Sequence, residues 1–199
     1  MKRLALLMGL CMASPAFALE PAELSGILGK APYLEADFTQ EKAIAALSRP
    51  LTTTGHLALA QGRGVLWQIE TPYAIGYFLA ADKVVELTGG QRLEQDAAKL
   101  PWLAQVARVM NALLAGDTLA LSELFTLELS GTATDWRLHL VPRAAELRSV
   151  IASIELGGGA TLDRLNLVEA NGDKTAIRFA NTRTPAALPT ALQEFVSPP

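Results

Sequence analysis

The sequence predicts a mainly β domain, in which a strongly curved antiparallel sheet forms an unclosed β-barrel covered by a few helices. Strand-length runs follow one another every 10–13 residues or so, a spacing typical of consecutive antiparallel strands rather than βαβ units. One short helix and one helical insert interrupt these runs, and they are available to cover the single face that such a sheet buries. A curved sheet closed by helices favours an apolar pocket.

Residues 1–18 have the three parts of a secretory signal peptide. Lys2 and Arg3 give a basic start, and the apolar run Leu4–Ala13 is far shorter than the ~20 residues of a membrane-spanning helix. Ala16-Phe17-Ala18 then supplies the small residues of a cleavage site. We therefore expect export to the periplasm of a Gram-negative bacterium, with a signal peptide over 1–18 and one soluble domain over 19–199.

The composition of the mature chain argues against several kinds of site and partner. Cys11 is the one cysteine and lies in the signal peptide behind Leu10, so neither lipid anchoring nor a disulfide is expected. An exported chain without disulfides suits a bacterial periplasm. Loss of Lys2 and Arg3 lowers Lys+Arg from 17 to 15 against 20 Asp+Glu, a net charge of −5 that gives no reason to bind nucleic acid. Half of the residues are hydrophobic, and a dense core or an internal apolar cavity would accommodate them.

The first half of the mature chain predicts one helix and then five strands. Pro21 suits a first helical position, and the apolar residues after it recur at helical spacing through residue 32. Alternation over 34–47 indicates a strand. Gln61-Gly62-Arg63-Gly64 separates two strand-like runs and indicates a hairpin. The four strands expected after the first one cover 55–60, 65–70, 73–80 and 83–88.

Residues 91–122 are expected to form the helical insert. Pro101 begins a helix over 101–114, and Gly116-Asp117 ends it. One face of this helix is apolar and forms the candidate lid, made of Trp102, Val106, Met110 and Leu113. Periodicity alone does not separate a movable lid from ordinary core packing. Five further strands are expected at 124–131, 136–143, 149–156, 161–170 and 174–182.

Alternate residues of the strands are expected to face the interior, where several would line an apolar, lipid-binding cavity. The period of two identifies these candidates, and a slip of one residue would reverse any one strand. They are Leu57, Leu59, Trp67, Ile69, Phe78, Val85, Leu138, Leu140, Leu165 and Phe179.

The sequence shows no pattern of catalytic or metal-binding residues. His56 and His139 both lie in predicted strands without a nucleophile motif, and they are interpreted as solvent-facing or hydrogen-bonded sheet residues. Zinc requires more histidine or cysteine than the mature chain offers. Gly157-Gly158-Gly159 is followed by Ala-Thr rather than a phosphate-loop lysine, so it is interpreted as a turn. We expect no enzyme, no cofactor and no metal.

The mature chain resembles the periplasmic outer-membrane lipoprotein carrier protein (LolA) family over almost its whole length. The segments that carry the resemblance are ADFTQEK (36–42), Gly55, Leu57, Leu66-Trp67, Pro72, the helical insert, WRLHLVPR (136–143) and LDRLNLVEANGDKTAIRFAN (162–181). The resemblance implies an unclosed barrel with a helical lid over an apolar cavity. It also implies a monomeric carrier of an acylated lipoprotein or another acyl-chain lipid, served by an inner-membrane donor complex and an outer-membrane acceptor.

One departure concerns the lid. Carriers of this family place a basic residue and a proline after the G-x-L-W strand, and that residue fastens the lid. The matching positions are interpreted as Gln61-Gly62, with Arg63 either taking over the fastening or serving as a solvated turn residue. The departure bears on lipoprotein as the cargo and not on a lipid-sized cavity. Two other functions stay open beside the carrier, a lipid- or lipoprotein-sensing binding module and a lipid-modifying enzyme.

Overall fold

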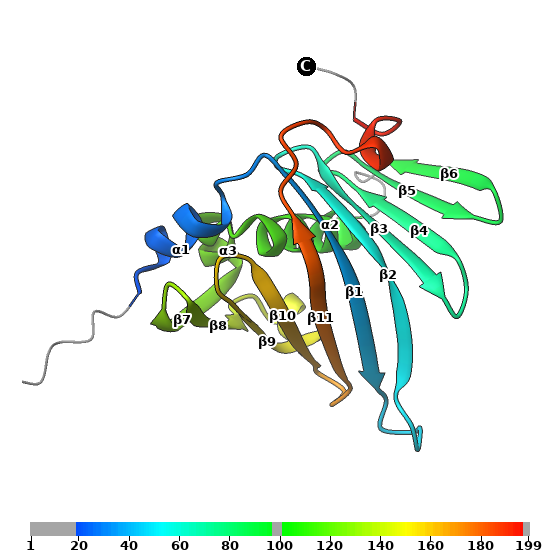
Figure 1. Ribbon diagram of the computed structural model, residues 1–199. Helices are drawn as coiled ribbons and strands as arrows, with labels where there is room; N and C mark the ends of the chain where they lie inside the picture. The colour runs from blue at the N-terminus through cyan, green and yellow to red at the C-terminus, as the bar shows by residue number, and fades with distance from the viewer. Residues whose placement is uncertain (1–18, 97–100, 197–199) are drawn as a thin grey trace, which may run out of the picture.

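The computed structural model describes residues 19–96 and 101–196, with the backbone alone over 101–107. Its dominant feature is one sheet of eleven antiparallel strands, drawn in Figure 1. The strands are β1 (Tyr33–Ala43), β2 (Leu51–Ala60), β3 (Gly64–Thr71), β4 (Ile75–Leu79), β5 (Lys83–Thr88), β6 (Gln91–Asp96), β7 (Phe125–Thr132), β8 (Asp135–Pro142), β9 (Ile151–Gly158), β10 (Leu162–Glu169) and β11 (Lys174–Arg183).

The order of the strands confirms the predicted fold class. The sheet runs β6-β5-β4-β3-β2-β1-β11-β10-β9-β8-β7, so every strand except β1 and β11 pairs only with its neighbours in sequence. Pairing of β1 with β11 joins the two halves of the chain, with Phe38 opposite Phe179. Strands β6 and β7 are the two edges of this order, so the sheet is curved but not closed (Figure 1).

The helices α1 (Pro21–Leu28), α2 (Pro101–Ala115) and α3 (Thr118–Leu124) lie together on one side of the sheet (Figure 1). Pro21 begins α1 as expected, and Glu20 and Glu23 form a capping box there. The Ser25 hydroxyl donates to the carbonyl of Gly116, 2.8 Å away, which ties α1 to the end of α2. Two shorter elements, α4 (Ala145–Arg148) and the 3₁₀ turn η2 (Thr190–Leu192), complete the fold.

The two faces of the sheet carry separate apolar clusters. The larger one lies between the sheet and helices α1–α3, and we call this side the inner face. The smaller one lies on the outer face, where Leu192, Phe195 and Val196 of the C-terminal segment pack on strands β2–β5. Phe195 stacks on Phe78 with ring centroids 4.8 Å apart.

The prediction that the helical insert covers residues 91–122 was wrong at its start, where the structure has strand β6. Residues 91–96 pair with β5 instead, with Gln91 opposite Thr88 and Asp96 opposite Lys83. They lie at the edge of the sheet, where most of their side chains are exposed. An edge strand exposed on both faces needs no apolar alternation, and this removes the pattern by which a strand is recognised.

Candidate functional site

The inner face of the sheet is the candidate site, because it gathers the apolar side chains of both halves of the chain under the helices. Six of the ten predicted cavity residues are buried in the inner cluster, and two more, Ile69 and Phe179, pack against it partly buried. The six are Leu57, Leu59, Trp67, Leu138, Leu140 and Leu165.

Phe78 and Val85 were wrongly placed in this set, since both belong to the cluster on the outer face. Phe78 in β4 lies between its two cross-strand partners, Leu66 in β3 and Val85 in β5. These three side chains face the C-terminal segment. Their neighbours Leu79 and Val84 lie on the inner face instead. The predicted register of β4 and β5 was therefore off by one residue, which exchanges the faces.

Three aromatic side chains from three strands meet on the inner face. The rings of Phe38 and Trp67 stack with centroids 4.1 Å apart. Phe179 meets Trp67 edge-on, with a centroid separation of 6.4 Å. Such a cluster offers a large apolar area in a fixed geometry.

Helix α2 closes over the part of this face formed by β2, β3 and β5. Leu113 is 2% exposed, and Val109 is also buried, whereas Met110 is partly buried against the same cluster. Asn111 donates from Nδ2 to the carbonyl oxygen of Leu79, 3.2 Å away. The side chains of the other two predicted lid residues, Trp102 and Val106, lie outside the described residues.

In β2 and β3, burial decreases from one end of the strand to the other. Along β2 the last four residues, ending at Ala60, are all buried, whereas Leu51 at its start is exposed. Strand β3 shows the reverse gradient, from buried Gly64 to exposed Thr71. We call the end with the β1–β2 hairpin the open end, and the end with the β2–β3 turn the covered end.

Arg63 lies in the β2–β3 turn at the covered end. Its Nη2 donates to the hydroxyl of Tyr33 over 2.9 Å, and its guanidinium lies 5.7 Å from the centre of that ring. Gln61-Gly62, the positions matched to the family's basic residue and proline, lie in the same turn directly after β2.

The outer face carries the polar network of the first three strands. His56 Nδ1 lies 2.5 Å from Asp37 Oδ1, and its Nε2 lies 3.1 Å from Glu70 Oε1. A hydrogen bond from Asn181, together with the contact and charge of His56, lowers the pKa of Asp37. His56 is thus a hydrogen-bonded sheet residue, and His139 lies across from Glu128 in the ladder.

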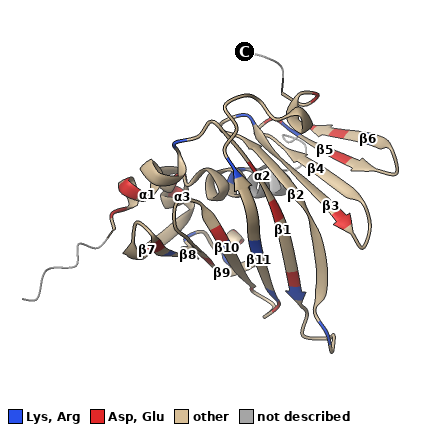
Figure 2. Ribbon diagram, viewed as in Figure 1, with Lys and Arg blue, Asp and Glu red and all other residues tan. Residues whose placement is uncertain are grey.

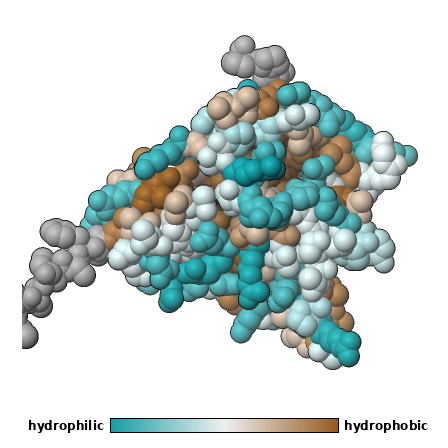
Figure 3. Space-filling view, in the orientation of Figure 1, coloured by the Kyte–Doolittle hydropathy of each residue, from teal (hydrophilic) through white to brown (hydrophobic). Residues whose placement is uncertain are grey.

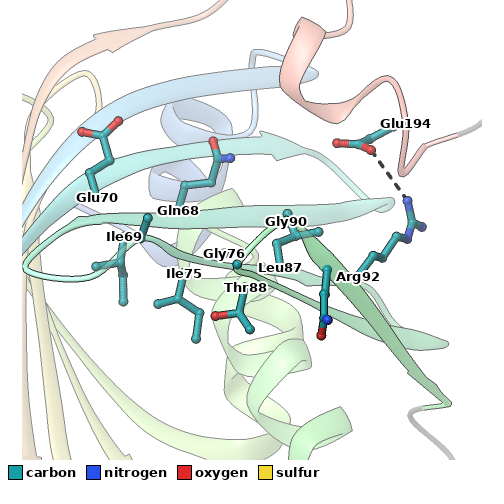
Figure 4. A pocket seen from close by; sticks show the side chains of 13 residues that line it. Gln68, Ile69, Glu70, Ile75, Gly76, Leu87, Thr88, Gly90, Arg92 and Glu194 are labelled. Atoms are coloured by element: carbon teal, nitrogen blue, oxygen red, sulfur yellow. Dashed lines mark ion pairs between the residues drawn. The ribbon is translucent and has the colours of Figure 1, made fainter.

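A groove of about 440 Å³ also opens over β3–β6, on a part of the sheet that the sequence did not single out. Figure 4 shows Gln68 and Glu70 pointing from the sheet toward the side of Glu194, while Ile69 and Ile75 point the opposite way. Arg92 and Glu194 form an ion pair of 3.8 Å beside it. Gly76 pairs with Gln68 in the floor of the groove, and the side chain of Leu87 lies over this glycine.

Two chemical features are absent from the described part of the chain. Residues 19–96 and 101–196 contain no cluster of three histidine, cysteine or acidic side chains able to hold a metal ion. Within the same residues, no helix has both the length and the apolar character needed to cross a membrane.

An open antiparallel sheet whose apolar inner face is covered by helices defines the structural class of this protein. The profile of the family described as "Outer membrane lipoprotein carrier protein LolA-like" matches residues 13–195, and the chain belongs to this family. An outer-membrane lipoprotein carrier protein of Methylococcus capsulatus is 33% identical over 191 residues, covering 94% of this chain and 88% of the relative.

Solved structures also align with most of the chain, at low sequence identity. A LolA superfamily protein from Nitrosomonas europaea aligns with a TM-score of 0.49 and 8% identity, covering 90% of this chain and 99% of that one. The lipoprotein LppX of Mycobacterium tuberculosis aligns with a TM-score of 0.42 and 9% identity, covering 85% and 96%.

Proposed function

We propose that this protein is a periplasmic carrier that shields the acyl chains of a lipoprotein, or of a related lipid, between the inner and the outer membrane. The observation that carries the proposal is the apolar inner face, gathered from both halves of the sheet and covered by a helix rather than by a second sheet. The name of the Methylococcus relative, a lipoprotein carrier, supports the same function.

The lipid-binding surface in this proposal is the inner cluster near α2. It comprises Leu57, Leu59, Trp67, Ile69, Leu138, Leu140, Leu165 and Phe179. In the closed arrangement Leu113 packs against the same cluster, so α2 occupies space that acyl chains need. Uptake therefore requires α2 to move, with Met110 and Leu113 exchanging the sheet for cargo.

The energies favour this exchange. Each methylene removed from water is worth about 0.8 kcal/mol, so one long acyl chain supplies on the order of 10 kcal/mol before the costs of association. Withdrawing one leucine from an apolar contact costs about 2 kcal/mol. Acyl chains therefore outweigh the loss of a few side-chain contacts of α2, and the empty protein closes again after release.

The fastening of α2 also fits a carrier that opens. Gln61-Gly62 stands where the family places its basic residue and proline, so a neutral glutamine occupies the fastening position. Arg63 contacts Tyr33 and holds the β2–β3 turn against the start of β1. We therefore assign Arg63 to that turn and Asn111 to the polar attachment of α2.

Titration with a fluorescent fatty acid tests this function. The mature protein should bind the probe with one-to-one stoichiometry, and replacement of Phe179 by Asp on the inner face should abolish binding. Arg178→Asp, the adjacent position on β11, is the matched control, because this exposed side chain alternates to the other face and its replacement should leave binding unchanged. Equal loss of binding in both variants would contradict an inner-face site.

A further inference from the structure

The open end of the sheet displays most of the large hydrophobic side chains that water reaches. Seven such side chains are exposed among residues 19–96 and 101–196. Five of them lie at the open end, on strand termini or in the connections between strands: Leu47, Leu51, Tyr73, Val141 and Val150. The other two are Leu93 on the edge strand and Leu119 on α3.

The β1–β2 hairpin carries the most pronounced of these features. Pairing of the two strands ends at Lys42 opposite Leu51, and residues 43–50 extend beyond it (Figure 1). This tip contains Ile44-Ala45-Ala46-Leu47, and Leu47 and Leu51 are 48% and 51% exposed. No acidic residue occurs between Glu41 and Glu70. Figure 3 shows hydrophobic and hydrophilic atoms side by side in this lower part of the molecule.

The next turn of the sheet adds an aromatic side chain at the same end. Thr71 pairs with Thr54, so the β3–β4 turn that follows Thr71 lies beside the start of β2. Tyr73 in this turn is 81% exposed. A tyrosine combines an apolar ring with a polar hydroxyl, which suits the boundary between hydrocarbon and water.

Two cations flank the hairpin. Arg49 lies within the tip, and Lys174 at the start of β11 pairs with Ala43 at the end of β1. Neither forms an ion pair with any residue of the described ranges. Figure 2 shows cationic residues at the lower ends of β1 and β11 and in the hairpin between β1 and β2. A lipid phosphate is a complementary group for both side chains.

We propose that the open end docks on a phospholipid bilayer, with Leu47, Leu51 and Tyr73 inserted at the level of the upper acyl chains. Arg49 and Lys174 then lie among the headgroups. A narrow protruding tip with few apolar side chains suits insertion into a fluid interface, whereas a protein partner of standard size needs a broad complementary surface.

Docking on a bilayer goes beyond the proposed carrier function, although it rests on that function and would orient the lipid-binding face toward the membrane. In β2 and β3 the inner face is least buried at the same open end, so a docked protein presents this less covered part of the sheet to the lipids. Acyl chains then enter or leave without crossing water. Because the mature chain has a net charge of −5, insertion of apolar side chains rather than bulk electrostatics drives the binding.

The mature chain allows a direct test, because the one cysteine of the sequence, Cys11, lies in the signal peptide and an introduced cysteine would be labelled alone. Leu47→Cys and, as the matched control, Leu119→Cys would each be labelled with the environment-sensitive dye NBD. Leu119 is 80% exposed on α3 and lies outside the open end. With vesicles of phosphatidylcholine, or of phosphatidylethanolamine and phosphatidylglycerol, the label at 47 should shift to the blue and that at 119 should not.

Vesicle flotation of unlabelled protein completes the test. L47S/L51S should lower the partition coefficient about 100-fold, since each buried leucine is worth about tenfold or more, while L119S should leave it unchanged. Absence of flotation, an equal shift of both labels, or flotation that L47S/L51S does not weaken would overturn the docking. Fatty-acid binding measured without vesicles reports on the carrier function separately, so either proposal can fail while the other holds.

Discussion

Replacing Leu113 with aspartate separates a movable α2 from a helix that is only part of the core. Leu113 is 2% exposed and packs in the inner cluster. In the closed arrangement the carboxylate has no cationic partner, which costs about 3–5 kcal/mol, and loss of the leucine burial adds about 2 kcal/mol. These costs together approach the whole stability of an ordinary domain, about 5–15 kcal/mol.

The two interpretations of α2 then predict different melting curves. If α2 moves away as a lid, it relieves the buried charge, so the sheet stays folded and the melting temperature falls by a few degrees. If α2 is fixed core, the full cost applies. At about 2–4 °C for each kcal/mol in a domain of this size, the melting temperature falls by at least 10 °C or so.

Circular dichroism melting beside titration with a fluorescent fatty acid distinguishes these outcomes. The carrier account expects a folded Leu113→Asp variant with little probe binding, because α2 no longer closes over the cargo. Leu119→Asp on exposed α3 is the control and should change neither quantity. A sharply lower melting temperature with unchanged binding per folded molecule would refute the lid.

Three further outcomes are expected. Phe195→Ala removes the ring that stacks on Phe78. It should destabilise the fold by about 3–5 kcal/mol in a denaturant titration. Fatty-acid binding per folded molecule should persist, because this cluster lies on the outer face. The pKa of Asp37 is lowered in the folded state, so its stabilising effect is present above the ordinary value of 3.8 and is lost as the pH falls through the folded pKa. Asp37→Asn should therefore flatten the acid side of the plot of unfolding free energy against pH, and an unchanged slope there would contradict the assignment. Intact-mass measurement of exported protein should find Leu19 as the first residue, and retention of Met1 on the exported protein would disprove cleavage after residue 18.

The second half of the sheet could be predicted well because each strand there has one apolar and one polar face. Along β8 buried Trp136, Leu138 and Leu140 alternate with less buried polar side chains. This alternation fixed both the strand and its inward residues. The helix α2 was equally clear, since a proline begins it and Gly116, with φ of +63°, ends it.

Strands β4 and β5 could not be assigned in the same way because both of their faces are covered. In β4, Phe78 faces the C-terminal segment, and Leu79 faces the helices. A strand that is apolar on both faces has no alternation to set its register. The residue that covers Phe78 on the outer face is Phe195, more than a hundred residues away in the sequence. No local sequence pattern predicts that contact.

The carrier function itself is tested most directly by native mass spectrometry of the mature protein, purified gently from the periplasm of its own host. The account predicts a population with the added mass of one acyl-chain lipid, which organic extraction recovers and which the Leu113→Asp variant lacks. Protein that carries no lipid from the periplasm, and that also fails to take up a fatty acid added in solution, would contradict the account.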